Sequence, residues 1–104
     1  LVKNNKKCFN SFGGENMEKL VEKINICFEN LKNQVCILEL DGPVSASTED
    51  LLIDYKINKC FELELNFKNS NYVINLSEMY KNEIKEKEGI LYLDGGNIFT
   101  IYIK

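Results

Sequence analysis

Apolar residues recur every three or four positions between residues 15 and 33, which places them on one face of an α-helix. Glu15 and Glu18 lie in the first turn of this segment and Lys32 lies in its last turn, where the helix dipole favours charges of those signs. The pattern predicts one long amphipathic helix over residues 15–33. Its apolar stripe consists of Met17, Leu20, Val21, Ile24, Cys27, Phe28 and Leu31.

After residue 34 the apolar period falls to two residues, which is typical of β-strands. Short turns separate several of the alternating segments and favour hairpins, and the pair Gly95-Gly96 supplies the positive φ that a tight turn requires. Within one alternating segment we expect Leu51, Ile53, Tyr55 and Ile57 to share the apolar face, with Leu52 as the exception. The segments predicted to form strands are 35–40, 51–58, 60–67, 72–76, 90–93 and 98–103.

Three segments do not follow the strand pattern. Residues 41–50 begin with Asp-Gly-Pro and continue with small residues, which predicts a loop. Residues 77–88 begin with Ser77 as a candidate cap and carry many charges four positions apart, which favours a short second helix. Their apolar face is thin, so a long loop is the alternative. Residues 1–14 are polar and rich in Lys and Asn, and we expect a tail or an extra edge segment.

These elements together indicate the α+β class. We expect the long N-terminal helix to pack on one face of a mainly antiparallel meander of five to six strands. The alternation of apolar and polar residues predicts that the other face of the sheet meets water. A chain of 104 residues accommodates a single domain, which we place at 15–104 with 1–14 as a separate N-terminal segment.

The composition excludes several kinds of chemistry. The chain contains no His, so a Ser or Cys nucleophile would lack its usual base and the commonest metal ligand is missing. No pair of cysteines has the C-x-x-C spacing, and no glycine-rich phosphate loop occurs. We therefore expect no cofactor and no bound metal, and we do not expect an enzyme.

Charge and cysteine usage limit the partners and the location. The net charge is −3 and all 13 basic residues are Lys, which argues against direct binding of nucleic acid. No apolar run is long enough to span a membrane, and no signal peptide is visible. The chain has enough apolar residues for a core and does not need disulfides as staples. We expect a reduced, cytoplasmic protein with no membrane partner.

Acidic side chains gather on the central predicted strands. Glu62 and Glu64 share one face of a strand at a separation of about 7 Å, and Asp54 has the same polar phase on the neighbouring strand. Paired carboxylates could serve a hydrolase or hold a hard cation, but polar residues alternate on any strand that faces water. With the predicted loop the acids form a patch of Glu39, Asp41, Glu49, Asp50, Asp54, Glu62 and Glu64.

This acidic patch favours a module that binds and neutralises or regulates a basic protein. Bacterial immunity proteins, antitoxins and inhibitors form the broad category, and a toxin nuclease is one such partner. The residues expected at the interface are Asp41, Glu49, Asp50, Asp54, Tyr55, Glu62, Glu64 and Tyr72.

Self-association is the alternative function. A homodimer could form through a sheet edge or through a second apolar patch on the sheet. The candidate residues for that patch are Val35, Ile37, Leu52, Val73, Ile98 and Tyr102. An enzyme that depends on carboxylates or a metal is the least supported interpretation.

Overall fold

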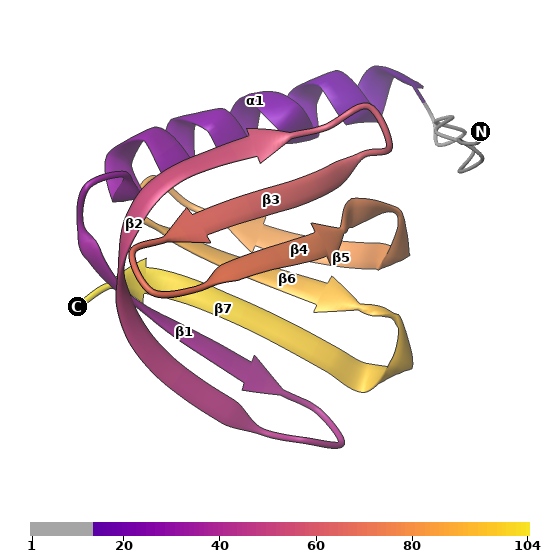
Figure 1. Cartoon of the computed structure of the whole chain (residues 1–104). Helices are drawn as coiled ribbons and strands as arrows, with labels where there is room; N and C mark the ends of the chain where they lie inside the picture. Colours follow the sequence, from indigo (N-terminus) through magenta and orange to yellow (C-terminus); the bar gives the residue numbers. More distant parts are fainter. Residues whose placement is uncertain (1–13) are drawn as a thin grey trace, which may run out of the picture.

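The computed structural model describes residues 14–104, with side chains described from Glu18 onward. The fold is α+β, with one N-terminal helix packed on a seven-stranded antiparallel sheet (Figure 1). The prediction of a tail or edge segment lies outside the described residues, except at Gly14, which belongs to the helix. The elements are α1 (Gly14–Leu31), β1 (Val35–Asp41), β2 (Ala46–Ile57), β3 (Glu62–Phe67), β4 (Asn71–Asn75), the 3-10 turn η1 (Leu76–Glu78), β5 (Met79–Ile84), β6 (Glu88–Leu93), the 3-10 turn η2 (Asp94–Gly96) and β7 (Asn97–Ile103).

The amphipathic stripe positions α1 as predicted. Its buried side chains are Ile24, Cys27, Phe28 and Leu31. The helix ends at Leu31, two residues before the predicted end, because Asn33 adopts a left-handed φ of 67°.

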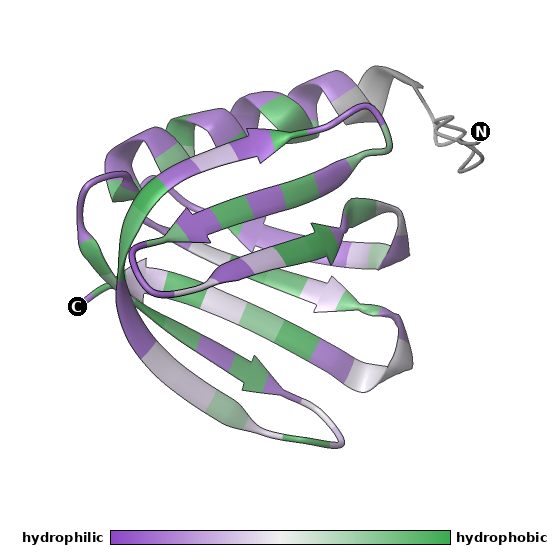
Figure 2. Ribbon diagram, in the orientation of Figure 1, coloured by the Kyte–Doolittle hydropathy of each residue, from purple (hydrophilic) through white to green (hydrophobic). Residues whose placement is uncertain are grey.

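The sheet consists of two meanders that meet in its middle. The strand order is β4-β3-β2-β1-β7-β6-β5, so the last strand of the chain pairs with the first. The sheet is strongly curved, and α1 covers one end of its interior, whereas the β1–β2 hairpin and the β6–β7 turn lie at the other end (Figure 1). Along most strands apolar and polar residues alternate (Figure 2), which separates an inner face from an outer one.

The predicted second helix at 77–88 is wrong, and so is the alternative loop. The segment holds only the short turn η1 and then β5, which pairs with β6. Lys81 and Glu83 lie on one face of the strand, and their charged atoms are 3.6 Å apart. Their charges therefore interact at a separation of two residues, as in a strand, and the ladder to β6 overrides the weak helical pattern.

The predicted loop at 41–50 is also too long. Ala46 already pairs with Leu40, and the ladder between β1 and β2 continues from there to Val35 and Leu51. Small polar residues such as Ser47 and Thr48 extend the strand because β1 provides backbone partners for them. This correction lengthens β2 without adding a strand, so β5 alone raises the six predicted segments to seven strands.

The predicted faces of three residues in β2 are reversed ahead of a bulge. Leu51 pairs with the outward-facing Val35, Leu52 is fully buried and Ile53 is 44% exposed, and the register with β3 shifts between Leu52 and Asp54. Leu52 is held in register with β1, because the N–H of Asn33 donates to Leu52 O at 2.7 Å and the N–H of Leu52 donates to Gln34 O at 3.0 Å. After the bulge, Tyr55 and later residues regain the predicted phase.

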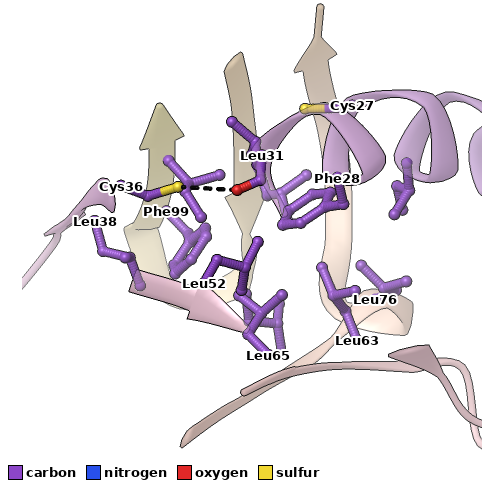
Figure 3. Close-up of a cluster of buried hydrophobic side chains, with 14 of the residues drawn as sticks. Cys27, Phe28, Leu31, Cys36, Leu38, Leu52, Leu63, Leu65, Leu76 and Phe99 are labelled. Atoms are coloured by element: carbon purple, nitrogen blue, oxygen red, sulfur yellow. Dashed lines mark hydrogen bonds between the residues drawn. The ribbon is translucent and has the colours of Figure 1, made fainter. Parts of the chain in front are cut away.

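The core lies between α1 and the inner face of the sheet (Figure 3). Cys27 and Cys36 are buried free thiols, and burial raises the pKa of each to about 11, so they behave as the small core residues that the sequence predicts. Cys60 is disulfide-bonded, so the expectation of a fully reduced chain is wrong. The cytoplasmic location stays a prediction, now without support from the cysteines.

Candidate functional site

An apolar cleft of about 490 Å³ lies in the interior of the curved sheet, at the end that α1 does not cover. Its volume falls in the range of about 300–1,000 Å³ that is common for binding pockets. Leu40 in its wall is 36% exposed although it faces the inner side of the sheet. The apolar side chains that line the cleft include Leu38, Leu40, Tyr72, Ile74, Leu93 and Phe99.

One wall of the cleft is formed by β1, β7 and the turns at their ends. Leu40 pairs with Phe99 across these strands, so both side chains face inward together. The β1–β2 hairpin closely approaches the β6–β7 turn at Gly42, where a Cβ atom would lie 2.5 Å from Asn97 Oδ1 and 3.3 Å from Asn97 Cα. Glycine is therefore the residue that allows the two turns to meet at the mouth of the cleft.

The opposite wall is the edge strand β4. The ring of Tyr72 packs edge-on against that of Phe67, with 5.6 Å between the ring centroids, and Ile74 is buried. At the end of the strand, Asn75 Oδ1 accepts hydrogen bonds from the N–H of Ser77 at 3.0 Å and from its hydroxyl at 2.6 Å. These contacts cap the turn η1, while the pairing of Tyr72 with Leu65 and of Ile74 with Leu63 directs the two β4 side chains inward.

The charged residues near the cleft are acids. Glu39 and Glu78 line it among the described residues, and Asp41 lines an adjoining hollow that shares Glu39. Glu39 pairs with Thr100 and Asp41 with Ile98, so both carboxylates project from the outer face of β1. No lysine of residues 14–104 lines either hollow. The carboxylate of Glu39 accepts a hydrogen bond of 2.8 Å from the Tyr102 hydroxyl, which raises the pKa of Tyr102. Glu78 beside the cleft and the acids on the outer face of β1 give this end of the sheet a negative field, which favours a positively charged ligand.

The acids of the predicted patch on the central strands do not form one continuous surface in the structure. Glu62 and Glu64 lie together on the outer face of β3, as expected, and Asn58 Nδ2 donates to both at 2.9 and 2.7 Å. Lys56 pairs with Glu64 across the strands, and Lys32 Nζ lies 3.6 Å from the Asp54 carboxylate. These acids belong to local polar networks on the opposite face of the sheet from the cleft.

Two other predicted interface residues hold the fold together. The carboxylate of Asp50 is buried and accepts hydrogen bonds from the N–H of Leu51, from Asn69 and from Ser70. Burial alone would raise the pKa of Asp50, but these hydrogen bonds outweigh it and lower the pKa below its usual value of 3.8.

Tyr55 is the second such residue, and it ties β2 to α1. Its hydroxyl donates to Glu29 Oε2 at 3.0 Å, and its ring centroid lies 5.5 Å from that of Phe28. Burial, and then the hydrogen bond to Glu29, raises the pKa of Tyr55 to about 12.

The remaining predicted residues lie in three places. Tyr72 lines the cleft, Asp41 lies in the adjoining hollow on the outer face of β1, and Glu49 forms an ion pair of 2.8 Å with Lys104 on the outer face. In the second apolar patch, Leu52 is in the core and was misplaced. The patch residues that the register places on the outer face are Val35, Ile37, Val73, Ile98 and Tyr102.

Sequence reasoning missed the cleft because its lining has the same alternating pattern as the core. Leu38 and Leu40 have the same inward phase, yet Leu38 is buried and Leu40 is exposed. A signal was available in the count of inward apolar positions, since the stripe of a single helix cannot cover the inner faces of so many strands.

Within residues 14–104, no group of three or more His, Cys, Asp or Glu side chains is arranged to hold a metal ion. The helix within this range lacks the length and apolar character needed to cross a membrane. Comparisons with protein-family models, with curated proteins and with solved structures yield no match to this chain.

Proposed function

We propose that this chain is a protein-binding module that takes an apolar segment of a basic partner into the cleft. The observation that carries the proposal is an apolar lining, represented by the exposed Leu40, with the acid Glu78 at its border. Covering the lining would contribute about 25 cal/mol per Å² of apolar surface removed from water, and the entropy cost of association offsets part of this gain. The acids would raise the rate of encounter with a basic partner.

The proposal keeps the partner that the sequence predicts but moves the contact surface. Tyr72 stays in the proposed interface because it lines the cleft, whereas Asp41 lies on the outer face of β1 beside it. Asp54, Glu62 and Glu64 contribute through the overall negative field and do not contact the partner. A module that blocks a basic surface in the manner of an immunity protein, antitoxin or inhibitor needs no catalytic residue.

Affinity capture from a lysate of the source organism, with matched baits, tests this function. The baits are the wild type, Leu40→Lys in the cleft and Ile53→Lys on the outer face, because Leu40 and Ile53 are similarly exposed at 36% and 44%. We expect a basic protein that the wild type and Ile53→Lys retain at low salt and release at high salt. The Leu40→Lys bait should recover about tenfold less of it, since a lysine blocks and charges the apolar wall.

Two outcomes would contradict the proposed function. A partner retained equally by Leu40→Lys would place the interface elsewhere. A partner lost equally from both lysine variants would indicate that net charge alone governs binding. Circular dichroism of the three proteins checks that each bait is folded.

A further inference from the structure

The edge strand β4 lacks the charges, proline and bulge that commonly protect the edge of a sheet. Its sequence, Asn71–Asn75, reads NYVIN and contains no charged residue and no proline. It pairs with β3 on one side and lies at the end of the sheet on the other. Natural edge strands commonly carry lysine, proline or a bulge that prevents another chain from pairing with them. An uncharged edge beside an open cleft is a candidate for strand addition.

The backbone of Val73 faces this open edge. The N–H of Phe67 donates to Ser70 O at 2.7 Å, and the N–H of Leu76 donates to Phe61 O at 3.0 Å, which sets the alternation of the ladder between them. In an antiparallel ladder every second residue pair exchanges hydrogen bonds. Tyr72 and Ile74 therefore bond to β3, while Val73, which is opposite Glu64, directs its N–H and C=O away from it.

The side chains of β4 alternate between the outer face of the sheet and the cleft. Val73 lies on the outer face and is 62% exposed, whereas its neighbours Tyr72 and Ile74 point toward the cleft. A strand that added to this edge would continue the same alternation. Every second side chain of that strand would enter the apolar cleft, and the others would face water.

The charges at the cleft indicate which strand fits. Glu78 lies three residues beyond the end of β4 and lines the cleft, and the carboxylates of Glu39 and Asp41 project from the outer face of β1. A second copy of this chain would bring like negative charges together, whereas an extended peptide with Lys or Arg at one end would complement Glu78.

We propose that the partner binds as an extended strand added to β4, with alternate apolar side chains in the cleft and a basic residue at one end. This mode of binding rests on the proposed function and specifies the partner: an extended segment with apolar residues at alternate positions and a positive charge at one end. Main-chain hydrogen bonds to Val73 provide affinity, and the cleft selects the side chains.

Selection from a phage-displayed library of random nine-residue peptides tests the strand addition. Selected peptides are measured by calorimetry against the wild type, Val73→Pro and Val73→Thr. Proline removes the edge N–H without removing a bond to β3 and is tolerated on edge strands, while threonine keeps both the N–H and the branched side chain. We expect Val73→Pro to raise Kd at least about tenfold and Val73→Thr to leave it within about threefold.

Hydrogen exchange gives a readout that does not depend on the proline variant. In the wild-type complex the Val73 amide should exchange at least about tenfold more slowly than in the free protein, because it gains a partner. Peptides that require Leu40 but bind Val73→Pro normally and leave the Val73 amide unprotected would overturn strand addition and leave the proposed function standing. A selection that returns no peptide sensitive to Leu40→Lys would contradict the proposed function itself.

Sedimentation of the wild-type protein tests the other occupant of the edge. We expect a monomer at micromolar concentration. A dimer that Val73→Pro dissociates would assign the β4 edge to a second copy of this chain and would overturn the proposal.

Discussion

The two edge strands of this sheet, β4 and β5, differ in how their open side is protected from pairing with another chain. Each has one side paired and one side open, because the sheet runs from one to the other. β5 carries Lys81 and Glu83, has a register shift after Met79, and packs near α1. It also places the polar Asn82 on its inner side, opposite Leu91. β4 has none of the charges and keeps a regular register with β3.

The difference teaches that protection of sheet edges is a local property of each strand. Charges, a bulge and an inward polar group on β5 all disfavour pairing with another chain. β4, which borders the cleft, lacks these devices and is open for a partner. The same contrast fits the proposal that one edge is used for binding while the other is kept unreactive.

The largest loss of stability is expected when the packing of α1 against the β5 side of the sheet is weakened. Ile24 is fully buried on α1, and Ile24→Ala should lower the free energy of unfolding by about 2–5 kcal/mol. Because α1 packs against β5 and β6, hydrogen exchange should rise more in β5 than in β4. Urea denaturation and exchange measured by mass spectrometry check both.

Ile26→Ala is the matched control for that variant. Ile26 lies on the same helix but is 55% exposed, so its truncation should change stability by less than about 0.5 kcal/mol. Equal losses from the two variants would mean that α1 does not bury its stripe against the sheet.

A smaller effect, of opposite sign, is expected at Asn82 in β5. Its Oδ1 atom is buried and has no hydrogen-bond partner among the described residues. Asn82→Leu keeps the size of the side chain and removes the unsatisfied acceptor, so it should stabilise the protein by about 1 kcal/mol. Thermal unfolding would show a higher Tm, whereas a lower Tm would mean that Asn82 has a polar partner in solution.

The same variant sharpens the comparison of the edges. Asn82→Leu makes the inner side of β5 apolar, like that of β4, and removes one of the devices that protect it. Light scattering at rising protein concentration should then reveal self-association that the wild type does not show.

The smallest effect on stability is expected at acidic pH, and it concerns the turn that leads into β4. Asp50 accepts hydrogen bonds from Asn69 and Ser70 in the turn that leads into β4, and its pKa lies below the usual 3.8. A lowered pKa in the folded state means that the stabilisation is present above about pH 4 and is lost as the pH falls through the folded pKa. Thermal unfolding below and above pH 4 should show this loss.

Asp50→Asn isolates the contribution of this carboxylate. The variant should show a weaker dependence of Tm on pH in the acidic range, since the titrating group is gone. If the dependence of Tm on pH is unchanged in this variant, other carboxylates cause the acid sensitivity. The stability of the β3–β4 turn would then not depend on pH.

Much of the fold could be predicted because the periodic pattern is strong where one face is buried. The helix stripe from Leu20 to Leu31 and the alternation in β3 both follow from local spacing and were predicted correctly. The errors occurred where pairing decides the structure. Ser47 and Thr48 form a strand because β1 lies beside them, and Ile53 points outward because the turn at Asn33 bonds to Leu52.

Less of the candidate site could be predicted. The outer acids Glu62 and Glu64 were correctly placed together, since two residues on one strand share a face by geometry alone. The cleft was not foreseen, because Leu40 and Phe99 lie far apart in the sequence and become neighbours only when β7 pairs with β1.

By itself the sequence determined the periods, and with them the helix, the hairpins and the two faces of the strands, because these depend on residues within a few positions of one another. The composition determined that no histidine is available for catalysis or metal binding. Only the tertiary structure decided that β1 joins β7, that the sheet curves past the end of α1, and that β4 is left open beside an apolar cleft. Those features arise from contacts between distant segments, which leave no periodic signal in the chain.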